Sequence, residues 1–142
     1  MKTSTRFFPI LFLSVAAFLM HSAVFAQMSG SYNIGADAGD DFESFQEAVD
    51  SLESQGVNGP VNILVDAGTY DEQVEINMIS GTSSDNTVSF HSATGDSTDV
   101  VLMYEAIDYN ANYVVKMFNT SYLTFKSITF HAKGTSYGRG VI

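Results

Sequence analysis

Residues 59–76 read GPVNILVDAGTYDEQVEI, and the fold depends on how this stretch is arranged. Apolar side chains recur at every second position over 61–65, which is the period of a β-strand. Residues 67–70, with acidic residues on both sides, are predicted to turn the chain, and a second alternating run starts at Val74. The two runs form either a hairpin in a small antiparallel sandwich or one corner of a chain that winds in a constant direction.

The N-terminus has the pattern of a secretory signal peptide. Lys2 and Arg6 supply the positive start, residues 7–20 are a mostly apolar run, and small residues precede the end of the segment at Ala26. The run is shorter than the roughly 20 residues that a membrane-spanning helix needs. We therefore expect residues 1–26 to be a signal peptide and the protein to be secreted or held at the cell surface, without membrane insertion after cleavage.

Charge excludes several kinds of partner. The chain has 142 residues, with sixteen Asp and Glu against six Lys and Arg. Two of the six cations, Lys2 and Arg6, belong to the predicted signal peptide, which leaves four cations against sixteen acids and a net charge of −12. Nucleic-acid and anionic membrane surfaces need clustered Lys and Arg, so neither is an expected partner. There is no cysteine, so no disulfide framework can stabilise the fold.

One helix is predicted, within a leading segment that covers residues 27–60. Apolar residues recur at helical spacing over 41–54, Asp40 or Asp41 can cap the start, and Gly56 can end the helix. Its apolar face must cover another part of the protein, so we interpret it as a capping helix. The residues of that face are Phe42, Phe45, Val49 and Leu52.

After Pro60 the apolar period changes to two. Turn-rich segments separate the short alternating runs, and no second helix is predicted. A parallel α/β fold needs crossover helices, so residues 61–142 are expected to be all-β. The predicted strands are 61–65, 74–79, 87–92, 100–104, 113–118, 122–125 and 127–131.

The all-β segment fits two architectures, an antiparallel β-sandwich and a parallel solenoid. Equivalent apolar positions recur at intervals near 25 residues, and such a period is typical of a repeating coil of three short strands. A capping helix before the first coil agrees with this interpretation, because a solenoid must cover its first strand edges. The intervals are Ile63 to Val88, Val88 to Val114, Val114 to Gly140 and Val74 to Val100.

Two segments resemble a known superfamily. DFESFQEAVDSL at 41–52, followed by VNILVDAGTYDEQVEI at 61–76, resembles the opening of right-handed parallel β-helix proteins of the pectin-lyase-like superfamily. Pectin methylesterases carry a similar helix and then a Gly-x-Tyr-x-Glu motif, which Gly68, Tyr70 and Glu72 match. The resemblance implies a right-handed parallel β-helix in which Gly68 turns the chain with a positive φ, Tyr70 covers the corner and Glu72 accepts hydrogen bonds from turn amides.

The later stretch NTVSFHSATGDSTDVVL, at 86–102, is similar to exported surface β-helix proteins of type-IX-secreting bacteria. In all, the resemblance covers residues 31–142. It implies no catalytic residue in this chain. The esterases use a Gln–Asp–Asp–Arg set from later coils, and here the only arginine after the signal peptide is Arg139.

The expected function is that of an exported β-helix protein that binds polysaccharide or mediates adhesion. Tyrosine rings near asparagine amides suit sugar rings, and the expected glycan contacts are Tyr104, Tyr109 and Tyr113. The alternative is a carbohydrate-active enzyme, an esterase or a lyase, whose active site lies beyond residue 142. Both interpretations take residues 61–142 as the first coils of a longer protein, because no capping segment follows the last predicted strand.

No motif requires a cofactor, but acidic groups can act as ligands of calcium. Such residues also cap turns, which is their commoner role. The candidate calcium groups are Asp71, Glu72 and Glu75; Asp37, Asp40 and Asp41; and Asp96 and Asp99.

Overall fold

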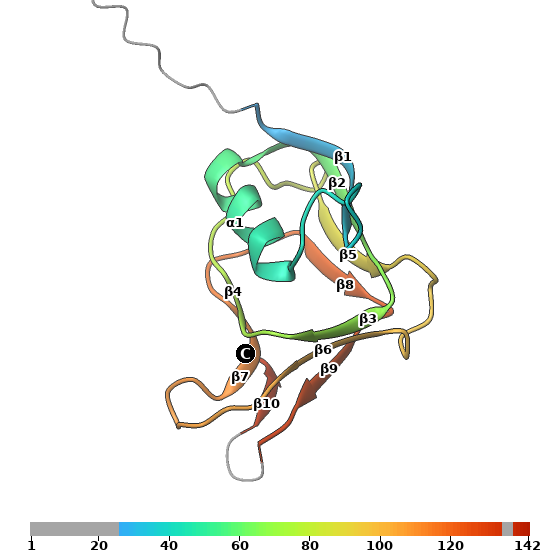
Figure 1. Ribbon diagram of the computed structural model, residues 1–142. Helices are drawn as coiled ribbons and strands as arrows, with labels where there is room; N and C mark the ends of the chain where they lie inside the picture. Colours follow the sequence, from blue (N-terminus) through green and yellow to red (C-terminus); the bar gives the residue numbers. More distant parts are fainter. Residues whose placement is uncertain (1–25, 135–137) are drawn as a thin grey trace, which may run out of the picture.

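The computed structural model describes residues 26–134 and 138–142, and it contains three parallel β-sheets and one helix (Figure 1). The sheet orders are β1-β2-β5-β8, β3-β6-β9 and β4-β7-β10. The fold is therefore all-β with a single helix, as predicted. In chain order the elements are β1 (Met28–Ile34), α1 (Phe45–Gln55), β2 (Val57–Val65), β3 (Gly68–Asp71), β4 (Val74–Ile76), β5 (Val88–Ser92), β6 (Val100–Tyr104), β7 (Tyr113–Met117), β8 (Leu123–Lys126), β9 (Thr129–Ala132) and β10 (Arg139–Val141).

The stretch 59–76 is not a hairpin. Its strands β2, β3 and β4 belong to three different sheets, and none of the three pairs with another. Each pairs in parallel with a later strand, β2 with β5, β3 with β6 and β4 with β7. Every strand pairing among the described residues is parallel, so the antiparallel sandwich is wrong. We call β2–β4, β5–β7 and β8–β10 the first, second and third layers.

The predicted turn at 67–70 is wrong for most of its length. Gly68–Asp71 form strand β3, so the change of direction falls on Asp66 and Ala67. Thr69 and Tyr70 favour an extended backbone. Their parallel partner strand, β6, is distant in the sequence, so a local turn pattern does not reveal it. Gly68 is not among the glycines with positive φ, so its predicted conformational role is also wrong.

The uniform repeat of about 25 residues is wrong as well. Val61 pairs with Val88, an interval of 27, whereas Val74 pairs with Val115, an interval of 41. The interval from Val88 to Val114 joined strands of different sheets, since β5 pairs with β8. The spacing near the end is correct, because Tyr113 pairs with Arg139 and so places Val114 opposite Gly140. Loops of unequal length connect the strands, so the register of the paired strands cannot be obtained by counting residues along the sequence.

The predicted helix exists, but its start is shifted. α1 begins at Phe45, and its N-cap is Ser44, whose hydroxyl accepts a hydrogen bond from the Glu47 N–H. Neither Asp40 nor Asp41 caps it. Gly56 ends the helix with a φ of 69°, as predicted. The apolar face is confirmed for Phe45, Val49 and Leu52, which are fully buried.

The remaining residue of the predicted face, Phe42, lies before α1. It forms an isolated parallel bridge with Ile34 at the end of β1 and is only partly buried. The segment before the helix therefore adds to the edge of the first sheet. β1 itself pairs in parallel with β2, so the leading segment is a strand for part of its length.

The core runs along the stack of layers. The ring of Phe45 in α1 stacks on Phe90 in β5 at a centroid distance of 5.8 Å, and Phe90 stacks on Phe125 in β8 at 5.2 Å. Phe90 pairs with Ile63 and Phe125 in the sheet, so these positions form one inward-facing row. The helix thus contributes a side chain to the same interior that the strands fill.

No helix in the described part of the chain is long and apolar enough to cross a membrane. The predicted signal peptide, apart from Ala26, lies outside the described residues.

Candidate functional site

Tyr70 and Glu72, two residues of the Gly-x-Tyr-x-Glu motif, join α1 to the first layer. The Tyr70 ring packs edge-on against Phe45 at 5.1 Å, and its hydroxyl donates to the backbone carbonyl of Asp66 at 3.0 Å. The Glu72 carboxylate accepts hydrogen bonds from the backbone N–H groups of Phe45 and Gln46, each at 3.0 Å. Glu72 was expected to bind turn amides. It instead binds amides of the first helical turn, where an acidic group is favourable.

Two further side chains join α1 to β4. The Gln46 side-chain oxygen accepts from the Glu75 N–H at 2.9 Å, and a Glu53 carboxylate oxygen accepts from the Asn77 N–H at 2.6 Å. These are amide groups at the edge of the third sheet. The helix therefore covers the interior with its apolar face and part of a strand edge with its polar side chains.

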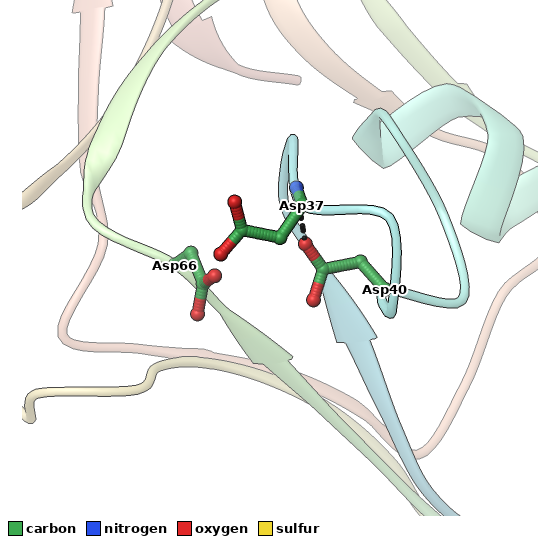
Figure 2. Close-up of side chains that lie close together, drawn as sticks. All are labelled: Asp37, Asp40 and Asp66. Atoms are coloured by element: carbon green, nitrogen blue, oxygen red, sulfur yellow. Dashed lines mark hydrogen bonds between the residues drawn. The ribbon is translucent and has the colours of Figure 1, made fainter.

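Three carboxylates meet where β1 and β2 end (Figure 2). Asp37 and Asp40 come from the loop after β1, Asp66 directly follows β2, and one oxygen from each lies within 4.8 Å of the others. The Asp37 N–H donates to an Asp40 carboxylate oxygen at 2.9 Å, which holds this loop closed. Gly35 lies beneath the cluster, and any larger side chain there would collide with the carboxylates of Asp40 and Asp66. We call Asp37, Asp40 and Asp66 the acidic cluster.

The acidic cluster corrects one predicted calcium group. Asp37 and Asp40 are together, but Asp41 is not with them, because its carboxylate accepts from the Asn33 N–H at 2.9 Å. Asp66 was missed. Its neighbour Val65 pairs with Ile34, so Asp66 and the loop after Ile34 leave adjacent parallel strands at the same edge. The sequence shows an acidic residue after each run, but only the parallel pairing of β1 with β2 brings them together.

A cavity of about 440 Å³ opens beside the acidic cluster. Asp37, Asp66, Glu43 and Tyr70 lie in its wall. Burial, and after it the negative charges of Asp66, Asp40 and Glu72, raise the pKa of the Tyr70 hydroxyl above its ordinary value. Carboxylate oxygens are ligands that calcium prefers, and six to eight oxygens complete its usual shell. The cluster can supply three of them, and calcium binding stays a prediction for Asp37 and Asp40.

The predicted group Asp71, Glu72 and Glu75 is not brought together. Asp71 forms an ion pair with Lys133 at 2.7 Å, Glu75 forms one with Lys116 at 2.8 Å, and Glu72 faces the helix. The ion pair with Lys116 lowers the pKa of Glu75. Asp71 lies in β3 and Glu75 in β4, and these strands belong to different sheets, so the change of direction between them separates residues that are close in the sequence.

The predicted pair Asp96 and Asp99 lies in a turn before β6. Asp96 accepts from the Thr98 N–H at 2.8 Å, and Asp99 accepts from the Thr94 hydroxyl at 2.6 Å. Backbone and side-chain hydrogen bonds from Thr98 lower the pKa of Asp96. Both residues therefore stabilise the turn, which is the commoner role of aspartate in such positions.

The three tyrosines expected to contact glycans differ in exposure. Tyr109 is 69% exposed, in the loop before β7, whereas Tyr104 is partly buried against the core. Tyr113 is only 7% exposed, and its hydroxyl donates to a Glu75 carboxylate oxygen at 3.1 Å. Burial and this bond raise the pKa of Tyr113. Of the three rings, Tyr109 presents the largest surface to a sugar, and the exposed ring of Phe118 was missed.

Comparison of the chain with protein families, curated proteins and solved structures finds no match. Membership of the pectin-lyase-like superfamily therefore stays a prediction from the two resembling segments.

Proposed function

We propose that this chain winds as a right-handed parallel β-helix and belongs to an exported protein that binds polysaccharide at its outer surface. Support for the winding comes from the order of the strands. Three successive strands enter three different sheets, and the next three strands pair with them in parallel and in the same order. Such an order is what a coil with three strands per turn produces.

The observation that carries the binding proposal is a row of polar side chains on the outer face of the first sheet. Asn62, Ser89 and Thr124 are register partners on successive strands β2, β5 and β8. The Ser89 hydroxyl donates to the Asn62 side-chain oxygen at 2.9 Å. This bond fixes the Asn62 amide and the Ser89 hydroxyl next to each other. Strands in a sheet are about 4.8 Å apart, so the row offers donors and acceptors at regular spacing to the hydroxyls of a sugar chain.

A second outward row lies beside the first. Leu64, His91 and Lys126 are register partners, and they combine apolar surface with groups that donate hydrogen bonds. A pyranose ring has an apolar face and polar edges, and both kinds of group occur here side by side. We call these two rows the sheet surface.

The test is a pull-down of the chain by insoluble neutral and acidic polysaccharides. We expect at least one of them to retain the parent chain, and the double variant Asn62→Ala with Thr124→Ala to lose retention several-fold. Ser84→Ala, in the exposed loop between β4 and β5, is the matched control and should bind as the parent does. Tyr109→Ala separately tests the most exposed of the three tyrosines expected to contact glycans. No retention by any polysaccharide, or equal retention of the double variant, would contradict the proposal.

The alternative of an esterase or lyase stays a prediction, because it places the catalytic residues beyond residue 142. Its discriminating measurement is release of methanol or unsaturated sugar from pectin by a protein that contains such residues.

A further inference from the structure

The expected signal peptide ends directly before the first strand of the fold. Its last residue, Ala26, and the residue after it, Gln27, are both exposed and lie outside the strands and the helix. β1 begins one residue later, at Met28, which is only 2% exposed. The cleavage pattern in the sequence and the start of the fold therefore fall at the same point of the chain.

Met28 is held firmly at the start of β1. Its backbone N–H donates to the carbonyl oxygen of Gly56 at 2.8 Å, and it pairs in parallel with Val57. Gly56 ends α1, so the first residue of β1 joins the end of the helix to the first sheet. These contacts involve no residue before Met28, and cleavage after Ala26 leaves them in place.

Cleavage at this point makes Gln27 the first residue of the chain. A signal peptidase site has small residues at the last and third-last positions of the removed segment, and Ala26 and Val24 meet this requirement. Gln27 then carries a free α-amine, and its own side chain carries a carboxamide. The two groups belong to one residue, so they can reach each other by rotation of the side chain alone.

An amine and a carboxamide placed in this way can react without any further reagent. The neutral α-amine nitrogen attacks the side-chain carbonyl carbon Cδ, a new carbon–nitrogen bond forms, and the bond from Cδ to Nε2 breaks. The amine nitrogen gives up one proton, and the departing nitrogen takes it up and leaves as ammonia. The product is a five-membered lactam, which is a pyroglutamyl residue, and no oxidation or reduction occurs.

The position of Gln27 allows this ring to close. Closure requires a side chain that can turn back onto its own α-amine, and the exposed Gln27 precedes the residues that β1 holds. The N–H that Met28 donates to Gly56 belongs to the peptide bond between Gln27 and Met28. The reaction does not change this bond, so β1 keeps its contact with the end of α1.

We propose that the exported chain begins with a pyroglutamyl residue formed from Gln27. The inference rests on the expected cleavage after Ala26 and does not depend on polysaccharide binding. Closure of the ring removes the positive charge of the α-amine from a chain that is already acidic. It also protects β1 from aminopeptidases, because these enzymes need a free α-amine.

The test is intact-mass spectrometry and N-terminal sequencing of the chain recovered after export from a bacterial host that expresses residues 1–142. Samples are measured at recovery and again after prolonged incubation in buffer. Gln27→Asn is the matched control. It keeps an amide on the first residue but shortens the side chain by one methylene, so closure would require a strained four-membered ring. Circular dichroism checks that the variant folds.

We expect the parent to start at residue 27, to be lighter than the open chain by one ammonia, and to resist N-terminal sequencing. After denaturation, pyroglutamyl aminopeptidase should remove the ring and give a readable sequence that starts at Met28. The variant should be readable without this treatment and should have the mass of an open chain.

Two results would overturn the proposal. One is a parent chain that starts at Gln27 and keeps its ammonia after the incubation, which would show that the ring does not close. The other is a chain that starts at a different residue, which would show that the expected cleavage site is wrong. The polysaccharide pull-down is read separately on the same samples, so failure of one proposal is distinguished from failure of the other.

Discussion

Glu72 lies 27 positions after Phe45 in the sequence, and its carboxylate accepts a hydrogen bond from the Phe45 backbone N–H at 3.0 Å. The first N–H groups of a helix have no partner within the helix, so this bond satisfies one of them with a charge of the favourable sign. Ser44, the residue directly before the helix, caps the same helix end. α1 therefore has one local cap and one from the first layer, and its stability depends on the strands beneath it.

The first prediction concerns this second cap. Glu72→Gln keeps the shape but removes the charge, and we expect the free energy of unfolding to fall by about 1 kcal/mol. Urea denaturation followed by circular dichroism measures the change. Glu105→Gln, at an exposed site, is the control and should stay within about 0.5 kcal/mol of the parent. Equal effects of the two changes would show that Glu72 does not stabilise the helix.

The second prediction concerns pH. Burial and neighbouring carboxylates raise the pKa of Tyr70 above its ordinary value of 10.0, so the folded state favours the neutral hydroxyl. Its contribution is complete below the unfolded-state pKa and is lost as pH rises through the folded-state pKa. We expect stability in urea to decline above pH 10 and Tyr70→Phe to reduce that decline. Ser84→Ala, an exposed change without a titrating group, should leave the profile unchanged. An identical slope in both variants would count against the assignment.

The third prediction separates two glycines. Gly81 has a φ of 89°, and a Cβ there would collide with the Val57 carbonyl oxygen. Gly68 lies in β3, and a Cβ there would lie 3.4 Å from the Tyr70 ring, an ordinary contact. We expect Gly81→Ala to lower the free energy of unfolding by roughly 1–3 kcal/mol. Gly68→Ala should be neutral or stabilising by about 0.5–1 kcal/mol, because alanine suits a strand better than glycine. The reverse order in thermal melts would refute both assignments.

The fourth prediction concerns the acidic cluster. Asp37, Asp40 and Asp66 repel one another, so Asp37→Asn in calcium-free buffer should raise the free energy of unfolding by about 0.5 kcal/mol. Calcium should raise the melting temperature of the parent more than that of the variant, since binding to the folded state alone stabilises it. Asp85→Asn serves as the control in the same scans. If calcium shifts parent and variant equally, the cluster is not the binding site.

Sequence patterns predicted the features that depend on near neighbours. The buried face of α1 was identified from its spacing, apart from Phe42, and most strands were found from alternation. Which strands pair with each other could not be predicted in this way. Val114 is 26 positions from Val88 but lies in another sheet, because the unequal loops, and not the alternation, determine which strands meet.

The candidate site shows the same limit. Asp37 and Asp40 are close in sequence and were grouped correctly, whereas Asp66 joins them only through the pairing of β1 with β2. Asp71, Glu72 and Glu75 are close in sequence too, yet each has a different partner. Proximity along the chain is a good guide within a loop and a poor one within strands, where side chains alternate.

The unequal loops have a consequence for how this protein can change. In the first sheet, the interval from Val61 to Val88 is 27 positions and the next one, from Val88 to Leu123, is 35, yet both pairs keep the same inward-facing row. Insertions between strands therefore leave the register intact, since loop closure costs little for added length. Evolution, or a protein engineer, can lengthen a corner and display a new segment there without redesigning the core.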